Sequence, residues 1–297
     1  MKKRKLLRIA VTALLIGLAA ACIGSYGMKG DLSLLDTREF ATREVCPEGN
    51  FDAVNIKDST ADVIFRLSED GVTRVELTED KEHQHHVNVQ DGTLYIEEDK
   101  GADSFFRISG IRKMSVTVYL PDKAYRDLDI TLSTGDFKMD APLRFENVKA
   151  GASTGCIDLH ADIGSVSATT TTGEIRMKEM KPESVALNTS TGGIQLTDLH
   201  AGSRISCAAS TGKAVLTNCI ADEIRVSTST GDISLTGCDA QTLKLAATTG
   251  DIRASLLSGK QFKTSSTTGK VQCPPDDGDG VCSAVTTTGN ISITVSR

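Results

Sequence analysis

The chain has 297 residues, of which 39% are hydrophobic, so it is long enough to bury one large core or two smaller ones. Its formal net charge is −6, and five basic residues lie within the first eight positions, so the remainder carries −11. This acidic remainder argues against binding of nucleic acid or of an anionic membrane by the folded part. Aromatic residues make up only 4%, which disfavours sites that stack sugars on aromatic rings.

Residues 1–23 have the pattern of an export signal. A basic segment over residues 1–8 precedes an apolar stretch over residues 9–21, and small residues lead into Cys22. The run Leu18-Ala19-Ala20-Ala21-Cys22 is similar to a lipobox, which predicts lipidation of Cys22, although the leucine is displaced by one position. The alternative is an uncleaved membrane anchor that continues to about Met28. Both interpretations predict a membrane-tethered protein on the outer side of the cytoplasmic membrane.

The next segments lead into the repeats. Residues 24–50 lack periodicity and are predicted to be a spacer. Residues 51–130 are predicted to be an irregular β section that caps a solenoid. Within it, Ser59–Val63 resembles the corner of the later repeats with alanine in place of glycine, and residues 87–96 predict a hairpin around Asp91-Gly92. Another strand over residues 116–120 is stopped by Pro121.

From residue 131 to residue 297 one pattern recurs nine times: a Ser or Thr, then Thr, then Gly. The interval is 18 to 20 residues, which indicates a repeat architecture. Each glycine is predicted to be a structural turn, because a fixed corner needs a positive φ or a close backbone approach. The nine glycines are Gly135, Gly155, Gly173, Gly192, Gly212, Gly231, Gly250, Gly269 and Gly289.

Apolar residues occupy fixed places on both sides of each glycine: seven and five places before it, and two and four places after it. A separation of two is the side-chain period of a strand. Each repeat therefore predicts two strands joined by the Thr-Gly corner. Stacked copies predict an all-β, parallel β-helix-like solenoid of about 19 residues per coil. An antiparallel β-sandwich is the alternative fold.

The C-terminus ends on an alternating strand over residues 291–295, which predicts an open strand edge. Two ways of covering this edge stay open. The polar segment 274–280 folds over it, or a second molecule does, in an end-to-end homo-oligomer.

Eight cysteines in an exported chain suggest disulfides. Five of them fall at apolar places of the repeat, where cysteine acts as a small buried hydrophobic residue. Two bridges stay open: Cys219 with Cys238 on adjacent coils, and Cys273 with Cys282 around the terminal loop.

No arrangement of residues predicts catalysis, a cofactor or a metal site, so the chain is not expected to be an enzyme. His83, His85 and His86 are interpreted as a solvated stretch that leads into the hairpin. The segment Asp276–Gly280 is interpreted as an acidic turn. Asp232 and Asp251 stack on adjacent coils and suggest at best a weak cation site. The Ser and Thr hydroxyls are expected to satisfy the backbone of the corners.

Three stretches resemble a family of bacterial β-strand-repeat proteins known as putative adhesins, a domain of unknown function. They are Asp91–Ile96, Val116–Pro121 and the repeated Ser/Thr-Thr-Gly-Asp-Ile, as at residues 229–233. The resemblance covers residues 51–297 and implies a solenoid presented at the cell envelope. It implies no catalytic residues.

These observations lead to one main hypothesis and two alternatives. The main hypothesis is a membrane-tethered extracytoplasmic solenoid of the bacterial cell envelope, which acts as an adhesin-like binding protein or as a structural element. Its expected partners are the membrane, through the N-terminal lipid or anchor, and a protein or glycan ligand. The alternatives are a regulatory partner of an envelope-stress or membrane signalling system and a polysaccharide-active enzyme.

Overall fold

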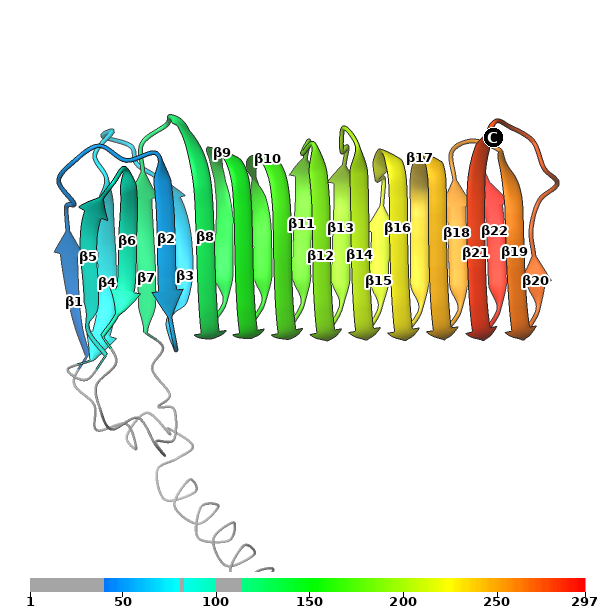
Figure 1. The fold of residues 1–297 in the computed structure, drawn as a ribbon, viewed down its shortest axis with the longest axis horizontal. Helices are drawn as coiled ribbons and strands as arrows, with labels where there is room; N and C mark the ends of the chain where they lie inside the picture. The colour runs from blue at the N-terminus through cyan, green and yellow to red at the C-terminus, as the bar shows by residue number, and fades with distance from the viewer. Residues whose placement is uncertain (1–39, 81–82, 100–113, 297) are drawn as a thin grey trace, which may run out of the picture.

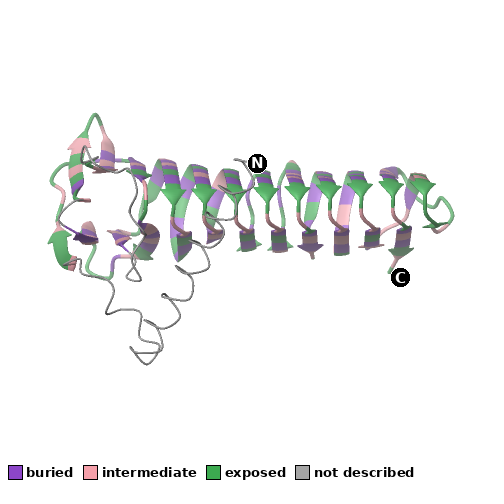
Figure 2. Cartoon of the chain, turned by 90° about the horizontal axis from the view of Figure 1, so that it is seen from below, coloured by how far each residue is buried: buried purple, intermediate pink, exposed green. Residues whose placement is uncertain are grey.

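Each Thr-Gly corner reverses the chain, and the strands on its two sides belong to two facing walls (Figures 1 and 2). The computed structural model describes residues 40–80, 83–99 and 114–296. These residues form 22 strands of one continuous sheet, and the described part contains no helix. We call the strand segments that lead into the corners the entry wall and the segments that leave them the exit wall; a long strand that runs from one corner to the next contributes a segment to each wall.

Seven strands lie in the N-terminal section: β1 (Phe40–Val45), β2 (Ala53–Asp58), β3 (Asp62–Leu67), β4 (Arg74–Asp80), β5 (His85–Gln90), β6 (Thr93–Glu98) and β7 (Ser115–Leu120). The repeats then supply β8 (Ala124–Thr134), β9 (Phe137–Thr154), β10 (Ile157–Thr172), β11 (Ile175–Met180), β12 (Ser184–Thr191), β13 (Ile194–Leu199), β14 (Arg204–Thr211) and β15 (Ala214–Thr217). The last seven strands are β16 (Ile220–Thr230), β17 (Ile233–Thr249), β18 (Ile252–Leu256), β19 (Lys260–Thr268), β20 (Val271–Gln272), β21 (Gly280–Thr288) and β22 (Ile291–Val295).

Neighbouring coils pair in parallel and in the register that the apolar places predict. On the entry wall Val166 pairs with Val185, and on the exit wall Ile157 pairs with Ile175. These residues are at most 3% exposed, so the apolar places of neighbouring coils form buried rows, which end at the outermost coil, where Val271 is 44% exposed. The parallel pairing confirms the solenoid and rules out the antiparallel sandwich. The hairpin is also confirmed, because β5 and β6 place Val89 opposite Leu94 and Val87 opposite Ile96.

The corner glycines let the coils approach closely. All nine have φ between 140° and 156°, a region that side chains rarely adopt. A Cβ atom added to any of them would overlap the backbone carbonyl of the adjacent corner, as Gly231 would overlap the oxygen of Gly212. Glycine is therefore required here both by the backbone conformation and by coil-to-coil contact.

Several coils have a second turn, at the end opposite the Thr-Gly corner, which the repeat pattern did not predict. The residue six places after the glycine is left-handed in four successive coils, with φ of 52° to 63°: Glu179, Asp198, Asn218 and Gly237. A buried residue follows each of them. The next coil lacks this extra residue, so Leu256 pairs with Cys238 and Leu257 is 48% exposed. Leu257, which stands seven places after Gly250, therefore does not continue the buried column of Met180, Leu199, Cys219 and Cys238.

At the N-terminal end the coils are not stacked in chain order. Strands β2 and β3 lie between the outer pair β6 and β7 and the inner pair β8 and β9. The antiparallel strands β5 and β4 cover β6 and β7, and β1 pairs with β4. Strand β1 lies within residues 24–50, so part of the range predicted as a spacer belongs to the sheet.

At the C-terminal end the last coil is inserted beneath the coil that precedes it. Strand β21 pairs with both β17 and β19, and β22 pairs with both β18 and β20. The expectation that the C-terminal strand forms the open edge is therefore wrong. The edge belongs to β19 and β20, and segment 274–280 covers the start of β19: Asp276 accepts the N–H of Phe262 at 2.8 Å.

Candidate binding surface

The hydroxyl residue three places before the corner glycine has a structural role. Thr170 and Thr189 are at most 4% exposed, and their hydroxyls donate to the carbonyl oxygens of Gly155 and Gly173 at 3.1 and 3.2 Å. Thr286 donates to Gly250 in the same way at 3.0 Å. The expectation that hydroxyls satisfy the corner backbone is confirmed for this column.

The next two positions are different, because their side chains point away from the core. Both positions hold Ser or Thr in all nine coils, and every one of these residues is exposed. Among the described residues, none of the 18 hydroxyls has a hydrogen-bond partner in the protein. We call this row the hydroxyl ridge. Its members are Ser133, Thr134, Ser153, Thr154, Thr171, Thr172, Ser190, Thr191, Ser210, Thr211, Ser229, Thr230, Thr248, Thr249, Thr267, Thr268, Thr287 and Thr288.

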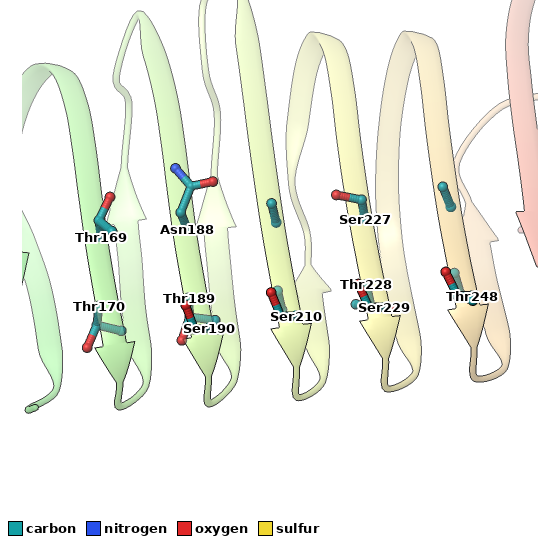
Figure 3. A pocket seen from close by; sticks show the side chains of 14 residues that line it. Thr169, Thr170, Asn188, Thr189, Ser190, Ser210, Ser227, Thr228, Ser229 and Thr248 are labelled. Carbon is teal, nitrogen blue, oxygen red and sulfur yellow. The ribbon is translucent and has the colours of Figure 1, made fainter. Parts of the chain in front are cut away.

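A shallow groove of about 430 Å³ runs along the entry wall beside the ridge, across β10, β12, β14, β16 and β17 (Figure 3). Its polar lining includes Thr169, Asn188, Ser210 and Ser227. Ala208 and Ala246 occupy equivalent places on their strands, and their small side chains leave the surface hollow there. No charged residue lines this groove, so it suits a neutral, hydroxyl-bearing part of a ligand.

On the exit wall, the carboxylates that directly follow the corner glycines accept hydrogen bonds from the backbone. Asp136 accepts the N–H of Cys156 at 2.8 Å, and Asp232 accepts the N–H of Asp251 at 2.9 Å. Asp251 in turn accepts the N–H of Asn290 at 2.7 Å. Each carboxylate thus satisfies the corner backbone of the next coil. Asp232 and Asp251 therefore have a structural role in place of the suggested cation site, and among the described residues no group of three or more metal-ligating side chains is arranged to hold a metal.

The histidine stretch is not a simple solvated segment, because the side chain of His85 is fully buried between two carboxylates. Its Nε2 lies 2.5 Å from Asp58, and its Nδ1 lies 2.9 Å from Glu79. Arg43 on β1 pairs with the other oxygen of Glu79 at 2.5 Å. With His85 protonated, these four groups carry no net charge. His86 is exposed, as expected.

These contacts shift the pKa values within the cluster in a consistent way. Burial by itself lowers the pKa of His85, but the hydrogen bonds and charges of Asp58 and Glu79 outweigh burial and raise it. Burial raises the pKa of Asp58, and the interactions with His85 and with the N–H groups of Ala61 and Thr60 lower it below its usual value. The cluster is therefore a structural ion network with no access to solvent at His85.

The cysteines of the described residues are free thiols. Cys207, Cys219, Cys238 and Cys282 are at most 1% exposed, which agrees with their apolar places in the repeat. Burial raises the pKa of Cys207 and of Cys282 to about 12, so neither is an ionised thiolate near neutral pH. The pairings Cys219–Cys238 and Cys273–Cys282 stay predictions.

The predicted lipidation site Cys22 and the export signal lie outside the described residues. Within the part of the chain that the structure describes, no helix is long and apolar enough to cross a membrane.

The fold and this repeated surface define a flattened parallel β-solenoid built on Thr-Gly corners. Residues 51–204 and 201–297 match the Toastrack DUF4097 family, and the chain belongs to that family. No curated protein matches the sequence.

Two solved structures show the same fold. One is named a putative lipid binding protein from Parabacteroides distasonis; it is 17% identical, with a TM-score of 0.56, over 87% of this chain and 97% of that one. The other is named a putative adhesin from the same species; it is 14% identical, with a TM-score of 0.53, over 86% of this chain and 98% of that one. At these identities the likeness establishes the fold alone.

Proposed function

We propose that this chain is an adhesin-like binding protein of the bacterial cell envelope, tethered to the membrane at its N-terminus, and that it is not an enzyme. The observation that carries this proposal is the hydroxyl ridge. The buried hydroxyls of Thr170, Thr189 and Thr286 bond to the corner backbone. The hydroxyls of the two exposed columns make no hydrogen bond among the described residues, which leaves them without a structural task. Eighteen exposed hydroxyls in register form a surface that donates and accepts hydrogen bonds at each coil.

The shape of the surface indicates an extended ligand. Successive coils repeat about every 4.8 Å, so nine coils present a ridge on the order of 40 Å long. The groove beside it crosses five strands and is open along the stack. A linear polymer that lies along the stack axis would contact equivalent residues on successive coils. The names of the two structural relatives, an adhesin and a lipid binding protein, also support a binding role.

Site-specific photo-crosslinking on intact cells tests this proposal. A photoreactive residue at Ser229 on the ridge is compared with one at Thr236, which is exposed on the exit wall just after the same Gly231 corner. We expect the Ser229 probe to capture glycan, peptidoglycan or foreign surface material and the Thr236 probe to capture far less. Capture of one specific membrane protein at both positions would contradict the proposal and support the signalling alternative.

A further inference from the structure

We infer that the ligand of the entry wall is an acidic polysaccharide, whose charged groups bind at Arg225 while its hydroxyl-bearing backbone lies in the groove. This inference rests on the proposed function and names the ligand class of the same surface. It starts from a second hollow of about 770 Å³ on the same wall, next to the hydroxyl groove. Its lining includes Arg204, Glu223, Arg225 and Lys244, together with the hydroxyl residues Ser184 and Ser206.

One acid orders two of the basic side chains. Glu223 accepts a hydrogen bond from Lys244 at 2.7 Å and forms an ion pair with Nε of Arg204 at 2.8 Å; the two basic residues lie on the strands to either side of it. The hydrogen bond from Lys244 contributes most to a lowered pKa of Glu223, so this carboxylate is ionised. Arg204 uses its Nε in this pair and keeps the other guanidinium N–H groups for a ligand.

Arg225 is a basic side chain of this hollow that has no protein partner among the described residues. It lies on β16 in register with Ser206 on one side and Lys244 on the other. Among the described residues it makes no hydrogen bond or ion pair, and it is exposed. A planar guanidinium binds a carboxylate through two parallel hydrogen bonds, which gives both affinity and orientation. Arg225 is therefore the residue expected to contact an acidic group directly.

The charge balance of this hollow differs from that of the whole molecule. Arg204, Arg225 and Lys244 carry three positive charges, and Asp222 and Glu223 carry two negative ones, so the hollow is +1 while the chain is −6. A negatively charged ligand is therefore repelled by most of the surface and attracted here.

The two hollows also lie along one strand. Side chains that alternate outward on β16 run from Arg225 to Ser227 and then to Ser229 on the ridge. An acidic group held at Arg225 would leave the sugar that bears it over Ser227 and the groove, while the polymer continues along the stack axis. One strand therefore offers hydroxyl contacts at Ser227 and Ser229 and a charged contact at Arg225. A polymer whose sugars carry both hydroxyl and acidic groups would match this arrangement.

Calorimetry with two matched probes tests the inference. The probes are an oligogalacturonate and its fully methyl-esterified form, which has the same backbone without the charges. We expect the acidic probe to bind more tightly, to weaken as salt is added, and to bind about three- to tenfold more weakly to Arg225→Gln. The matched control is Lys263→Gln, because Lys263 is an exposed lysine of the entry wall on the outermost coil. We expect this control to bind like the wild type.

The outcomes separate the inference from the proposed function. Equal binding of both probes, unaffected by Arg225→Gln but lost when Ser210 and Ser229 are changed to Asp, would overturn the acidic ligand and leave the proposed function standing. Failure of the wild type to bind either probe would overturn the acidic ligand, and the proposed function would then be decided by what the Ser229 probe captures on cells. Thermal unfolding of each variant checks that the surface substitution leaves the fold intact.

Discussion

At the residue scale, the place of a hydroxyl relative to the corner glycine decides its task. Where the third place before the glycine holds Thr, as at Thr170, this hydroxyl is buried and donates to a glycine carbonyl. The next two hydroxyls are exposed and unpartnered, and the glycine permits the close approach of coils. The first and second of these positions face opposite ways because side chains alternate along a strand. The Thr directly before the glycine is exposed because the strand ends there at the corner.

The corner glycines give the first prediction. We expect Gly231→Ala to lower the free energy of unfolding by about 3 kcal/mol or more, because its Cβ would overlap the oxygen of Gly212 in a backbone region that strains any side chain. Gly151→Ala is the control: its φ is ordinary, and the nearest atom to the added Cβ is 3.8 Å away. Denaturant unfolding should show a change within about 1 kcal/mol for this control. Equal losses for both variants would contradict the role assigned to the corners.

The buried histidine gives the second prediction, on the pH dependence of stability. The pKa of His85 is raised in the folded protein, so its contribution is complete below about pH 6.5 and is lost as the pH rises through the folded value. A neutral imidazole has one N–H group but faces two carboxylates. One buried carboxylate oxygen would then face the lone pair of the other ring nitrogen with no proton between them. Asp58 and Glu79 have lowered pKa values, so their contributions are lost only as the pH falls toward the acid range.

Melting temperatures between pH 5.5 and pH 9 check this prediction. We expect the wild type to lose stability toward pH 9 relative to His85→Gln, whose profile should be flatter. At low pH the same substitution should cost about 3 kcal/mol, because it leaves buried charge uncompensated. His86→Gln is the control, because its side chain is 75% exposed. A parallel shift of wild type and His85→Gln at every pH would show that His85 does not titrate in this range.

At the scale of elements, the C-terminal end of the stack places an internal segment outermost. The C-terminal coil lies beneath the coil of β19 and β20. A terminal strand at the edge would be held on one side and would fray from its free end. An outer coil that is connected to the protein at both ends frays less readily. This order therefore protects the C-terminal end of the solenoid, whereas at the N-terminal end the first described strand, β1, lies at the edge beside β4.

Hydrogen exchange measures this order directly. We expect the amides of β21 and β22 to exchange more slowly than those of β19 and β20, although β21 and β22 are nearer the C-terminus. The reason is that the strands of the last coil have partners on both sides, and β20 is exposed. Faster exchange in 281–295 than in 260–272 would contradict the inserted coil and support stacking in chain order.

At the scale of the whole molecule, the two ends of the solenoid differ in how their strand edges are covered. The N-terminal end is closed by antiparallel strands, and β1 brings the chain into the sheet beside the Arg43–Glu79 pair. The C-terminal end keeps a partly covered edge on β19 and exposes Val271. The proposed tether and the binding surface thus belong to different parts of the molecule, and the end-to-end homo-oligomer stays a prediction for the C-terminal edge.

The tether itself gives a prediction at this scale. We expect the full chain to sediment with membranes and to incorporate a labelled fatty acid, because the segment before Cys22 is similar to a lipobox. Cys22→Ser should abolish the label and the processing of the signal. Cys46→Ser is the control, because Cys46 is exposed and outside the signal. A wild-type chain that stays with membranes without any fatty-acid label would favour the uncleaved anchor.

The local repeat explains what could be predicted without a structure. The Thr-Gly interval, the apolar places and the Asp91-Gly92 turn act over a few residues, so the sequence alone specified the coil, the parallel stacking and the hairpin. The left-handed turn at Asp198 and Asn218 was also readable in principle, because Asp and Asn tolerate that conformation. The exposure of the Ser or Thr two places before each glycine follows from the alternation that buries its neighbours. The Thr directly before the glycine is exposed because the strand ends there at the corner.

The tertiary structure alone decided the order of coils at the two ends and the burial of His85. Every coil offers the same backbone edge, so the repeat does not specify which coil lies outermost; the outcome depends on long-range pairing and on the covering of the last edge. His85 stands in a polar stretch whose pattern indicates solvent, and it is buried because β1, β2 and β4 bring Arg43, Asp58 and Glu79 together around it. The repeat determines which residues of neighbouring coils pair with one another. The charged residues around His85 come from β1, β2 and β4, which lie outside the repeat, so no period in the sequence brings them together.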